Sequence, residues 1–156
     1  MTTTHPSPLL SRSAGRTVLA TAYGYPRQGR DRELKRGQER YWRGDTSIDE
    51  LLTIATQVRA QRLETLTSAG LDELPVGDFS LYDHVLDTAW LVGAIPPRFD
   101  RAVPDADPAS THTAEGGWQR YFAMARGTGD EPPLEMTKWF DTNYHYLVPE
   151  LSGSAT

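Results

Sequence analysis

Short apolar runs, separated by longer stretches of helical periodicity, organise this sequence. Three runs are short enough to be buried strands, at residues 17–23, 71–76 and 134–140. A loop from Gly24 to Gly29, which contains a proline, closes the first run. Because helical segments lie between the runs, the pattern predicts an α/β fold with parallel strands.

The helical segment at residues 47–69 carries the clearest signal. Ser47 and Glu50 have the spacing of a capping box, and Gly70 stands where a C-terminal cap is expected. Further helices are predicted at 31–42, 81–93 and 118–126, with Pro96-Pro97 ending the second of these three and residues 98–117 forming a long loop. Along residues 47–69, helical spacing relates the apolar positions Ile48, Leu51, Leu52, Ala55, Val58 and Leu66.

Three strands are few for a parallel sheet, which needs cover on both faces. The chain therefore looks like part of a larger sheet or barrel, whose open edge could support self-association. By composition, residues 1–16 are expected to be a disordered extension, 17–151 the folded part and 152–156 a tail.

Composition excludes several classes of function. The 156 residues contain no cysteine, which excludes disulfides, cysteine-ligated zinc and thiol nucleophiles. No apolar run has the length of a membrane span, and the N-terminus lacks the apolar core of a signal peptide, so a cytoplasmic protein without membrane contact is expected. The net charge of −5 argues against a nucleic-acid partner.

A local basic segment stands out on this acidic chain. Between Arg27 and Arg43 there are seven basic residues and three acidic ones. Arg32 and Lys35 share a face at the start of a predicted helix, where free backbone N–H groups and the helix dipole favour an anion. The alternative is a solvated helix face with internal pairs, Asp31 with Lys35 and Glu39 with Arg43.

Two further groups of residues are weaker candidates. Lys138 lies among apolar and aromatic residues near the end of the third predicted strand, where ligands bind in parallel α/β proteins, although it could instead simply extend to solvent. Asp78, Tyr82, Asp83 and His84 suggest a metal site, but no third ligand has suitable spacing, and helix capping by Asp78 or Ser80 explains the pattern better.

A set of motifs is spread in order along residues 17–151, and its last member is long and specific. The motifs are Tyr25-Pro26-Arg27, Gly29, Arg32-Glu33-Leu34-Lys35, Tyr41-Trp42, Gly44, Leu74–Asp87, Ala123–Gly127, Glu135–Phe140, Thr142–Tyr146 and Val148–Glu150. Together these motifs resemble the cobalamin-independent methionine synthase family.

The resemblance implies a fold and a function. The fold is a partial (βα)8 barrel, comprising the first three strands and their helices of the family's N-terminal barrel. The function is a share in methyl transfer from 5-methyltetrahydropteroyltriglutamate to homocysteine, in which this segment holds the folate's polyglutamate tail. The residues implied for tail binding are Asp31, Arg32, Glu33, Leu34, Lys35 and Lys138.

The resemblance also limits what this chain is expected to do alone. In the family, zinc and homocysteine are bound mostly by the C-terminal barrel, so no cofactor, no metal ligand and no catalytic residue is expected here. The first hypothesis is therefore a part of the methyltransferase that is inactive by itself. The alternative is a stand-alone, non-catalytic binding or interaction module derived from the same barrel.

Overall fold

The structure of the chain is a computed structural model that describes residues 18–102 and 115–151. The expected disordered extension, the expected tail and most of the loop expected at 98–117 lie outside these residues. The chain divides into two compact units between Phe79 and Ser80.

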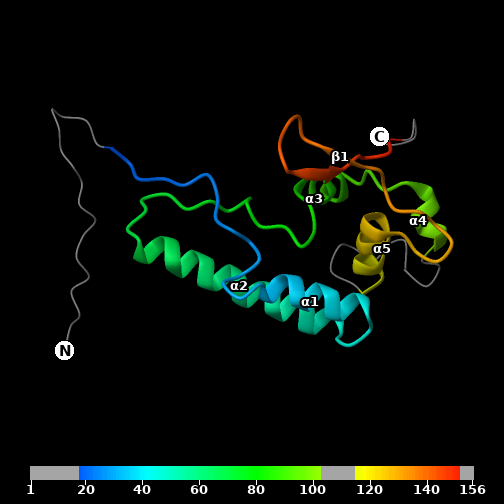
Figure 1. The fold of residues 1–156 in the computed structure, drawn as a ribbon, viewed down its shortest axis with the longest axis horizontal. Helices are drawn as coiled ribbons and strands as arrows, with labels where there is room; N and C mark the ends of the chain where they lie inside the picture. The colour runs from blue at the N-terminus through cyan, green and yellow to red at the C-terminus, as the bar shows by residue number, and fades with distance from the viewer. Residues whose placement is uncertain (1–17, 103–114, 152–156) are drawn as a thin grey trace. The chain divides into compact units, whose positions relative to one another are not determined.

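The first unit is built on two helices, α1 (Glu33–Trp42) and α2 (Ile48–Ser68), which pack along each other (Figure 1). The contact is close at Gly37, where an added Cβ would lie 3.1 Å from Ile54 and 3.2 Å from Leu51. The capping box predicted for α2 is confirmed, because Ser47 and Glu50 exchange side-chain to backbone hydrogen bonds. The buried apolar residues of this unit are Leu34, Ile48, Leu51, Ala55, Val58 and Leu66.

The first two predicted strands contact each other over a very short length. Thr21 and Glu73 form a single parallel bridge, in the direction that the sequence predicted. Asp72 reinforces it, because its carboxylate accepts a hydrogen bond from Ala20 N at 2.7 Å and its own N–H donates to Ala20 O at 2.9 Å. Two segments that were expected to be strands thus meet in one bridge among the described residues.

The second unit combines helices with a hairpin (Figure 1). Strand β1 (Met136–Lys138) pairs with β2 (His145–Leu147) in antiparallel register, Thr137 lying opposite Tyr146. The expectation of a parallel strand over residues 134–140 is therefore corrected: a tight turn returns the chain onto itself, and the local hairpin supplies the backbone hydrogen bonds. The helices are α3 (His84–Leu91), α4 (Pro97–Ala102) and α5 (Glu115–Arg126).

Helix α4 corrects a second expectation. Pro96-Pro97 was expected to lead into a loop, but Pro97 is the first residue of α4. A proline is tolerated there because the first helical N–H has no partner within the helix. The α4 residue Phe99 is fully buried.

An aromatic cluster forms the core of the second unit. The ring of Tyr121 makes edge-to-face contacts with Trp90, Trp118 and Phe122, with centroids 5.2–6.0 Å apart. Leu86, Phe99, Met124 and Leu147 have almost no exposed surface and belong to the same core. The described residues thus form a mixed fold of helices and one small sheet, which is consistent with the predicted α/β class. None of their helices has the length and apolar character needed to cross a membrane.

Candidate functional site

The loop that leads into α1 is closed by a tight turn. Arg32 N donates to Gly29 O at 3.3 Å, and Leu34 N donates to Gln28 O at 3.1 Å. Gly29 has φ +81°, and an added Cβ would lie 2.0 Å from a carboxylate oxygen of Glu33. Only glycine fits this position without displacing Glu33.

Arg32 has a left-handed backbone, with φ 62° and ψ 37°. For a residue other than glycine this conformation costs on the order of 1–3 kcal/mol, and it persists where neighbouring contacts enforce it. Two side chains of α1 supply such contacts at the preceding residue. Glu33 accepts a hydrogen bond from Asp31 N at 3.0 Å, and the Arg36 guanidinium donates to Asp31 O. We call this pair of contacts the Asp31 clamp.

The predicted tail-binding residues differ in what they can offer a ligand. The side chains of Arg32 and Lys35 are exposed, and Lys35 lies 3.7 Å from Glu39, not beside Asp31 as one alternative proposed. Glu33 is engaged in the Asp31 clamp, and Leu34 is fully buried in the core. Of the predicted tail-binding residues in this segment, Arg32 and Lys35 are therefore the two cations, and both present charge to solvent.

A hollow of about 320 Å³ lies between this loop and α2. Its walls include two arginines and no acid, and they comprise Tyr25, Pro26, Gly29, Arg30, Val58, Gln61, Arg62 and Thr65. Arg62 is neutralised by Asp78, with which it forms a buried ion pair, whereas Arg30 is exposed. Its volume lies at the lower end of the range found for small-molecule sites.

Lys138, the remaining predicted cation, ends β1 in the second unit. Its side chain is exposed, and the turn that follows carries Trp139 and Phe140, whose side chains are 52% and 79% exposed. Their rings contact each other edge to face, and Trp139 also contacts Tyr146. Lys138 thus stands beside an accessible aromatic surface, while Arg32 and Lys35 belong to the first unit.

Asp83 has a role that the sequence left open. It is 5% exposed and caps α3 through a hydrogen bond from Leu86 N at 3.0 Å. It also accepts hydrogen bonds from Tyr144 Oη at 2.7 Å and from Leu147 N at 3.2 Å, so it ties α3 to the hairpin. The expectation that Asp78 or Ser80 caps this helix is wrong.

Metal binding finds no support in these residues. Among the residues that the structure describes, no three His, Cys, Asp or Glu side chains gather as a metal site would require. The zinc that the family resemblance implies therefore finds no set of ligands among these residues.

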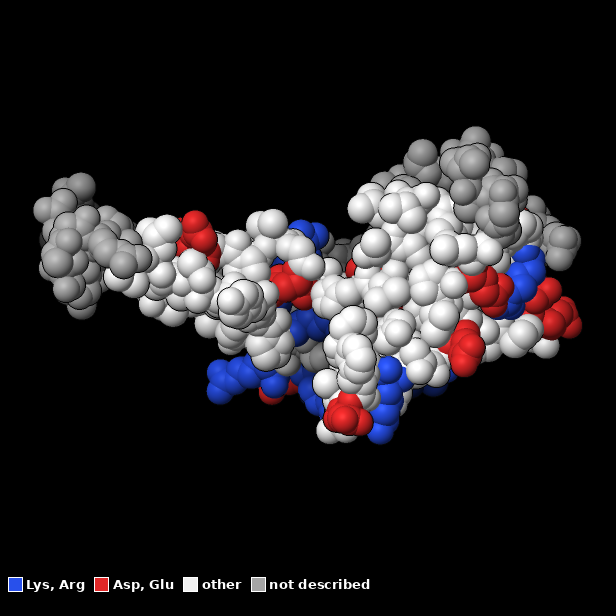
Figure 2. Space-filling view, turned by 90° about the horizontal axis from the view of Figure 1, so that it is seen from above, with Lys and Arg blue, Asp and Glu red and all other residues white. Residues whose placement is uncertain are grey.

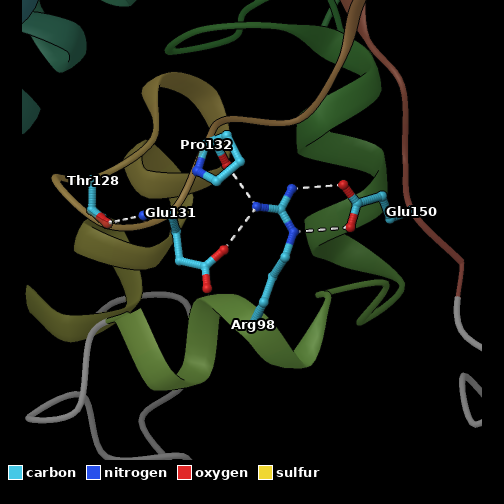
Figure 3. A network of polar contacts seen from close by, with 5 residues as sticks. All are labelled: Arg98, Thr128, Glu131, Pro132 and Glu150. Carbon is cyan, nitrogen blue, oxygen red and sulfur yellow. Dashed lines mark hydrogen bonds and ion pairs between the residues drawn. The ribbon is translucent and has the colours of Figure 1, made fainter.

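Arg98 joins the two ends of the hairpin (Figure 3). From α4, its guanidinium donates to Glu150 Oε1 at 2.6 Å and Oε2 at 3.0 Å, downstream of β2. It also donates to Pro132 O at 2.6 Å and to Glu131 at 3.3 Å, upstream of β1. We call this network the Arg98 clip. The hydrogen bonds from Arg98 hold the pKa of the Glu150 carboxyl below its usual value.

The pKa of a half-buried carboxyl, that of Asp87, is shifted in the opposite direction. Asp87 accepts a hydrogen bond from the Tyr121 hydroxyl at 2.5 Å, yet burial is the larger effect and raises the pKa of Asp87. Burial, together with the adjacent Asp87 charge, also raises the pKa of the Tyr121 phenol. Both groups serve the core and are separate from the predicted tail-binding cations.

Charge on the surface is mixed. In the space-filling view, basic side chains appear in several groups with acidic side chains among them (Figure 2). Such a surface fits a small anion at a local site better than a long polyanion.

The motifs around these residues place the chain in a known class. Residues 19–156 match the family described as cobalamin-independent synthase, N-terminal domain, and the chain belongs to that family. The family resemblance predicted from the sequence is thereby confirmed.

The individual relatives carry a more specific name. A 5-methyltetrahydropteroyltriglutamate–homocysteine methyltransferase from Streptomyces avermitilis is 57% identical over 143 residues, which is 92% of this chain and 17% of that protein. Proteins of the same name from Nitrosomonas europaea and Mycobacterium tuberculosis are 50% and 53% identical, each over 88% of this chain and 16–17% of the relative. The chain therefore spans about a sixth of the length of these relatives.

Proposed function

We propose that this chain contributes the polyglutamate-tail site of a methyltransferase that transfers a methyl group from 5-methyltetrahydropteroyltriglutamate to homocysteine. The observation that carries the proposal is the exposed pair Arg32 and Lys35 on a strained, clamped helix start, within a motif shared with the family. The relatives' name specifies a substrate with several glutamates, and hence a string of carboxylates.

The chemistry of the site suits that substrate. The positive end of the α1 dipole lies at this helix start, where carboxylates are favoured. Arginine and lysine then add charge-assisted hydrogen bonds. We assign Lys138 to the same tail, with the aromatic turn beside it offering apolar contact. Asp31, Glu33 and Leu34 serve the site through the loop and the core.

We also propose that the α/β segment is a partial (βα)8 barrel. The parallel bridge between Thr21 and Glu73 has the direction that such a barrel requires. Val18, Tyr23 and Val76, on or next to the bridged segments, are 65%, 107% and 85% exposed, as expected for strands that further sheet would cover.

Calorimetric titration tests the tail site. The chain is titrated with mono- and triglutamyl 5-methyltetrahydropteroate, and Lys138→Ala, Lys35→Ala and Arg32→Ala are compared with Arg43→Ala, which removes an exposed charge at the far end of α1. Triglutamate should bind more tightly and lose affinity with added salt. Each of the first three variants should weaken it about two- to fivefold, the range for exposed ion pairs of up to about 1 kcal/mol.

The control Arg43→Ala should leave affinity unchanged. Equal affinity for the two folates, or wild-type affinity in all three site variants, would remove the tail-binding assignment.

A further inference from the structure

The Asp31 clamp surrounds the backbone of one residue from both sides. The Glu33 carboxylate accepts a hydrogen bond from the N–H of Asp31, and the Arg36 guanidinium donates one to its C=O. Both side chains come from α1, the helix that this loop enters. The helix therefore supplies the side chains that hold the geometry of its own entry.

What the clamp fixes is the conformation of the next residue. Arg32 is left-handed, and its side chain caps no backbone group of α1. Its C=O accepts a hydrogen bond from Arg36 N at 3.0 Å. Arg36 thus binds the peptide carbonyls on both sides of Arg32, because its guanidinium donates to Asp31 O and its N–H donates to Arg32 O. A freed Asp31 would let Arg32 relax toward right-handed or extended backbone, which other residues prefer.

We propose that Arg36 and Glu33 are positioning residues of the tail-binding site, which direct the Arg32 side chain toward the anionic tail by holding Arg32 left-handed. The inference rests on the proposed function of Arg32. It assigns a role to Arg36, a residue outside the predicted set, and changes the role of Glu33 from ligand contact to support.

The charge of Glu33 allows a positioning role to be distinguished from a direct electrostatic effect on the ligand. Removing Glu33 takes a negative charge away from a site for carboxylates, so simple electrostatics requires tighter binding in Glu33→Ala. Positioning requires the reverse, because the acceptor for Asp31 N is lost. Glu33→Gln is the matched control, because it removes the charge but keeps an oxygen acceptor of similar reach.

The experiment measures the affinity for triglutamyl 5-methyltetrahydropteroate in the full chain. Glu33→Ala should bind about two- to fivefold more weakly than the unsubstituted chain, while Glu33→Gln should bind at least as tightly as it. Arg36→Ala should weaken binding about as much as Arg32→Ala, and Arg36→Lys should restore most of the loss. In the double variant Arg32→Ala/Arg36→Ala, the second substitution should add nothing to the first.

Three outcomes would overturn the inference: tighter binding in Glu33→Ala, unchanged binding in Arg36→Ala, or losses that multiply in the double variant and so make Arg36 a direct contact. Circular dichroism of each variant confirms that α1 is retained, and Arg40→Ala, a charge loss on the same helix, should have no effect. An unsubstituted chain without preference for triglutamate over monoglutamate would overturn the tail site and this inference together, whereas a preference with multiplying losses removes this inference only.

Discussion

Arg62 of α2 forms a buried ion pair with Asp78, and both partners also bind the backbone of Tyr25, in the loop that leads into α1. The two side chains are 7% and 14% exposed. Arg62 donates to Tyr25 O at 2.7 Å, and Asp78 accepts from Tyr25 N at 2.8 Å. The pair therefore attaches the loop that leads to Arg32 to the long helix of the first unit.

Breaking this pair should strongly destabilise the first unit. Arg62→Ala leaves Asp78 charged and partly buried without its partner, a change that typically costs about 3–5 kcal/mol. Urea unfolding followed by circular dichroism measures the loss. Arg59→Ala is the control, because Arg59 lies on the same helix but is exposed over the Phe79 ring, and it should cost less than about 1 kcal/mol. Similar losses in the two variants would contradict the structural role of the ion pair.

Glycine at position 32 should separate stability from binding. Arg32→Gly removes the strain of a left-handed arginine and should leave the chain as stable as before or up to about 1 kcal/mol more stable. The same variant should lose the tail affinity that the Arg32 side chain supplies. Thermal unfolding and folate titration measure the two effects.

Gly29→Ala serves as a control with the opposite expected effect on stability, because it introduces strain where Arg32→Gly removes it. It places a Cβ 2.0 Å from Glu33 at a positive φ, and should therefore destabilise the chain. A clear loss of stability in Arg32→Gly would show that Arg32 is not strained.

Sequence periodicity predicted α1, α2, α3 and α5, because their signals are local, and it missed the short α4. The capping box of α2 and the apolar spacing of its buried face are contained within the helix itself, and the structure has α2 at Ile48–Ser68. The partner of residues 134–140 was missed because pairing depends on where the chain turns. Here the turn begins at Phe140, which takes a positive φ of 46° that its residue type does not predict.

The supporting contacts of the site were harder to predict than its cations. Arg62 and Asp78 are 16 residues apart, so no local spacing links them. A signal was present nonetheless: Arg62 falls on the apolar face of α2, four residues from Val58 and from Leu66, and a cation there requires a buried partner. The left-handed backbone of Arg32 had no such signal, because the clamp that holds it arises only once the loop is folded.

Asp83 should contribute more to stability than an ordinary cap. Asp83→Ala removes the α3 cap and leaves Leu147 N and Tyr144 Oη without this acceptor, so the loss should be on the order of 2–4 kcal/mol. Ser47→Ala removes the exposed cap of α2 and should cost only about 1 kcal/mol. Chemical unfolding of the two variants compares the values, and equal losses would show that the contacts to the hairpin contribute nothing.

The stability of the second unit should respond to pH through two carboxyls whose pKa values are shifted in opposite directions. Glu150 has a lowered pKa, so its contribution is present above its usual value of 4.5 and is lost as the pH falls through the folded-state value. Because Glu150 is half exposed, the effect should be small. Asp87 has a raised pKa, so the stability gained by its protonation is present below 3.8 and lost as the pH rises through the folded-state value.

Unfolding measured from pH 3 to pH 7 tests these signs. The free energy of unfolding of Asp87→Asn, relative to that of the unsubstituted chain, should increase as the pH rises, because the substitution removes a partly buried charge. The relative free energy of unfolding of Glu150→Gln should decrease over the same pH range. A pH-independent difference for either variant would contradict the corresponding shift.

The isolated chain of 156 residues should form no methionine from homocysteine and 5-methyltetrahydropteroyltriglutamate, with or without added zinc. It contains no cysteine, and its described residues gather no three metal-binding side chains. Product analysis with protein purified from a host that lacks methionine synthases measures this. Methionine above the blank, formed in proportion to the chain, would refute the prediction.

The Arg98 clip determines how the hairpin that carries Lys138 can open. Arg98 binds the chain just before β1 and just after β2, so residues 133–149 form a loop whose two ends are held together. Val148 N donates to Glu135 O at 2.8 Å immediately inside this closure. Fraying from the open end, the usual route by which a hairpin separates, is therefore blocked. Amide hydrogens at the turn end of the hairpin should therefore exchange with solvent before that of Val148, whose exchange should require release of the clip.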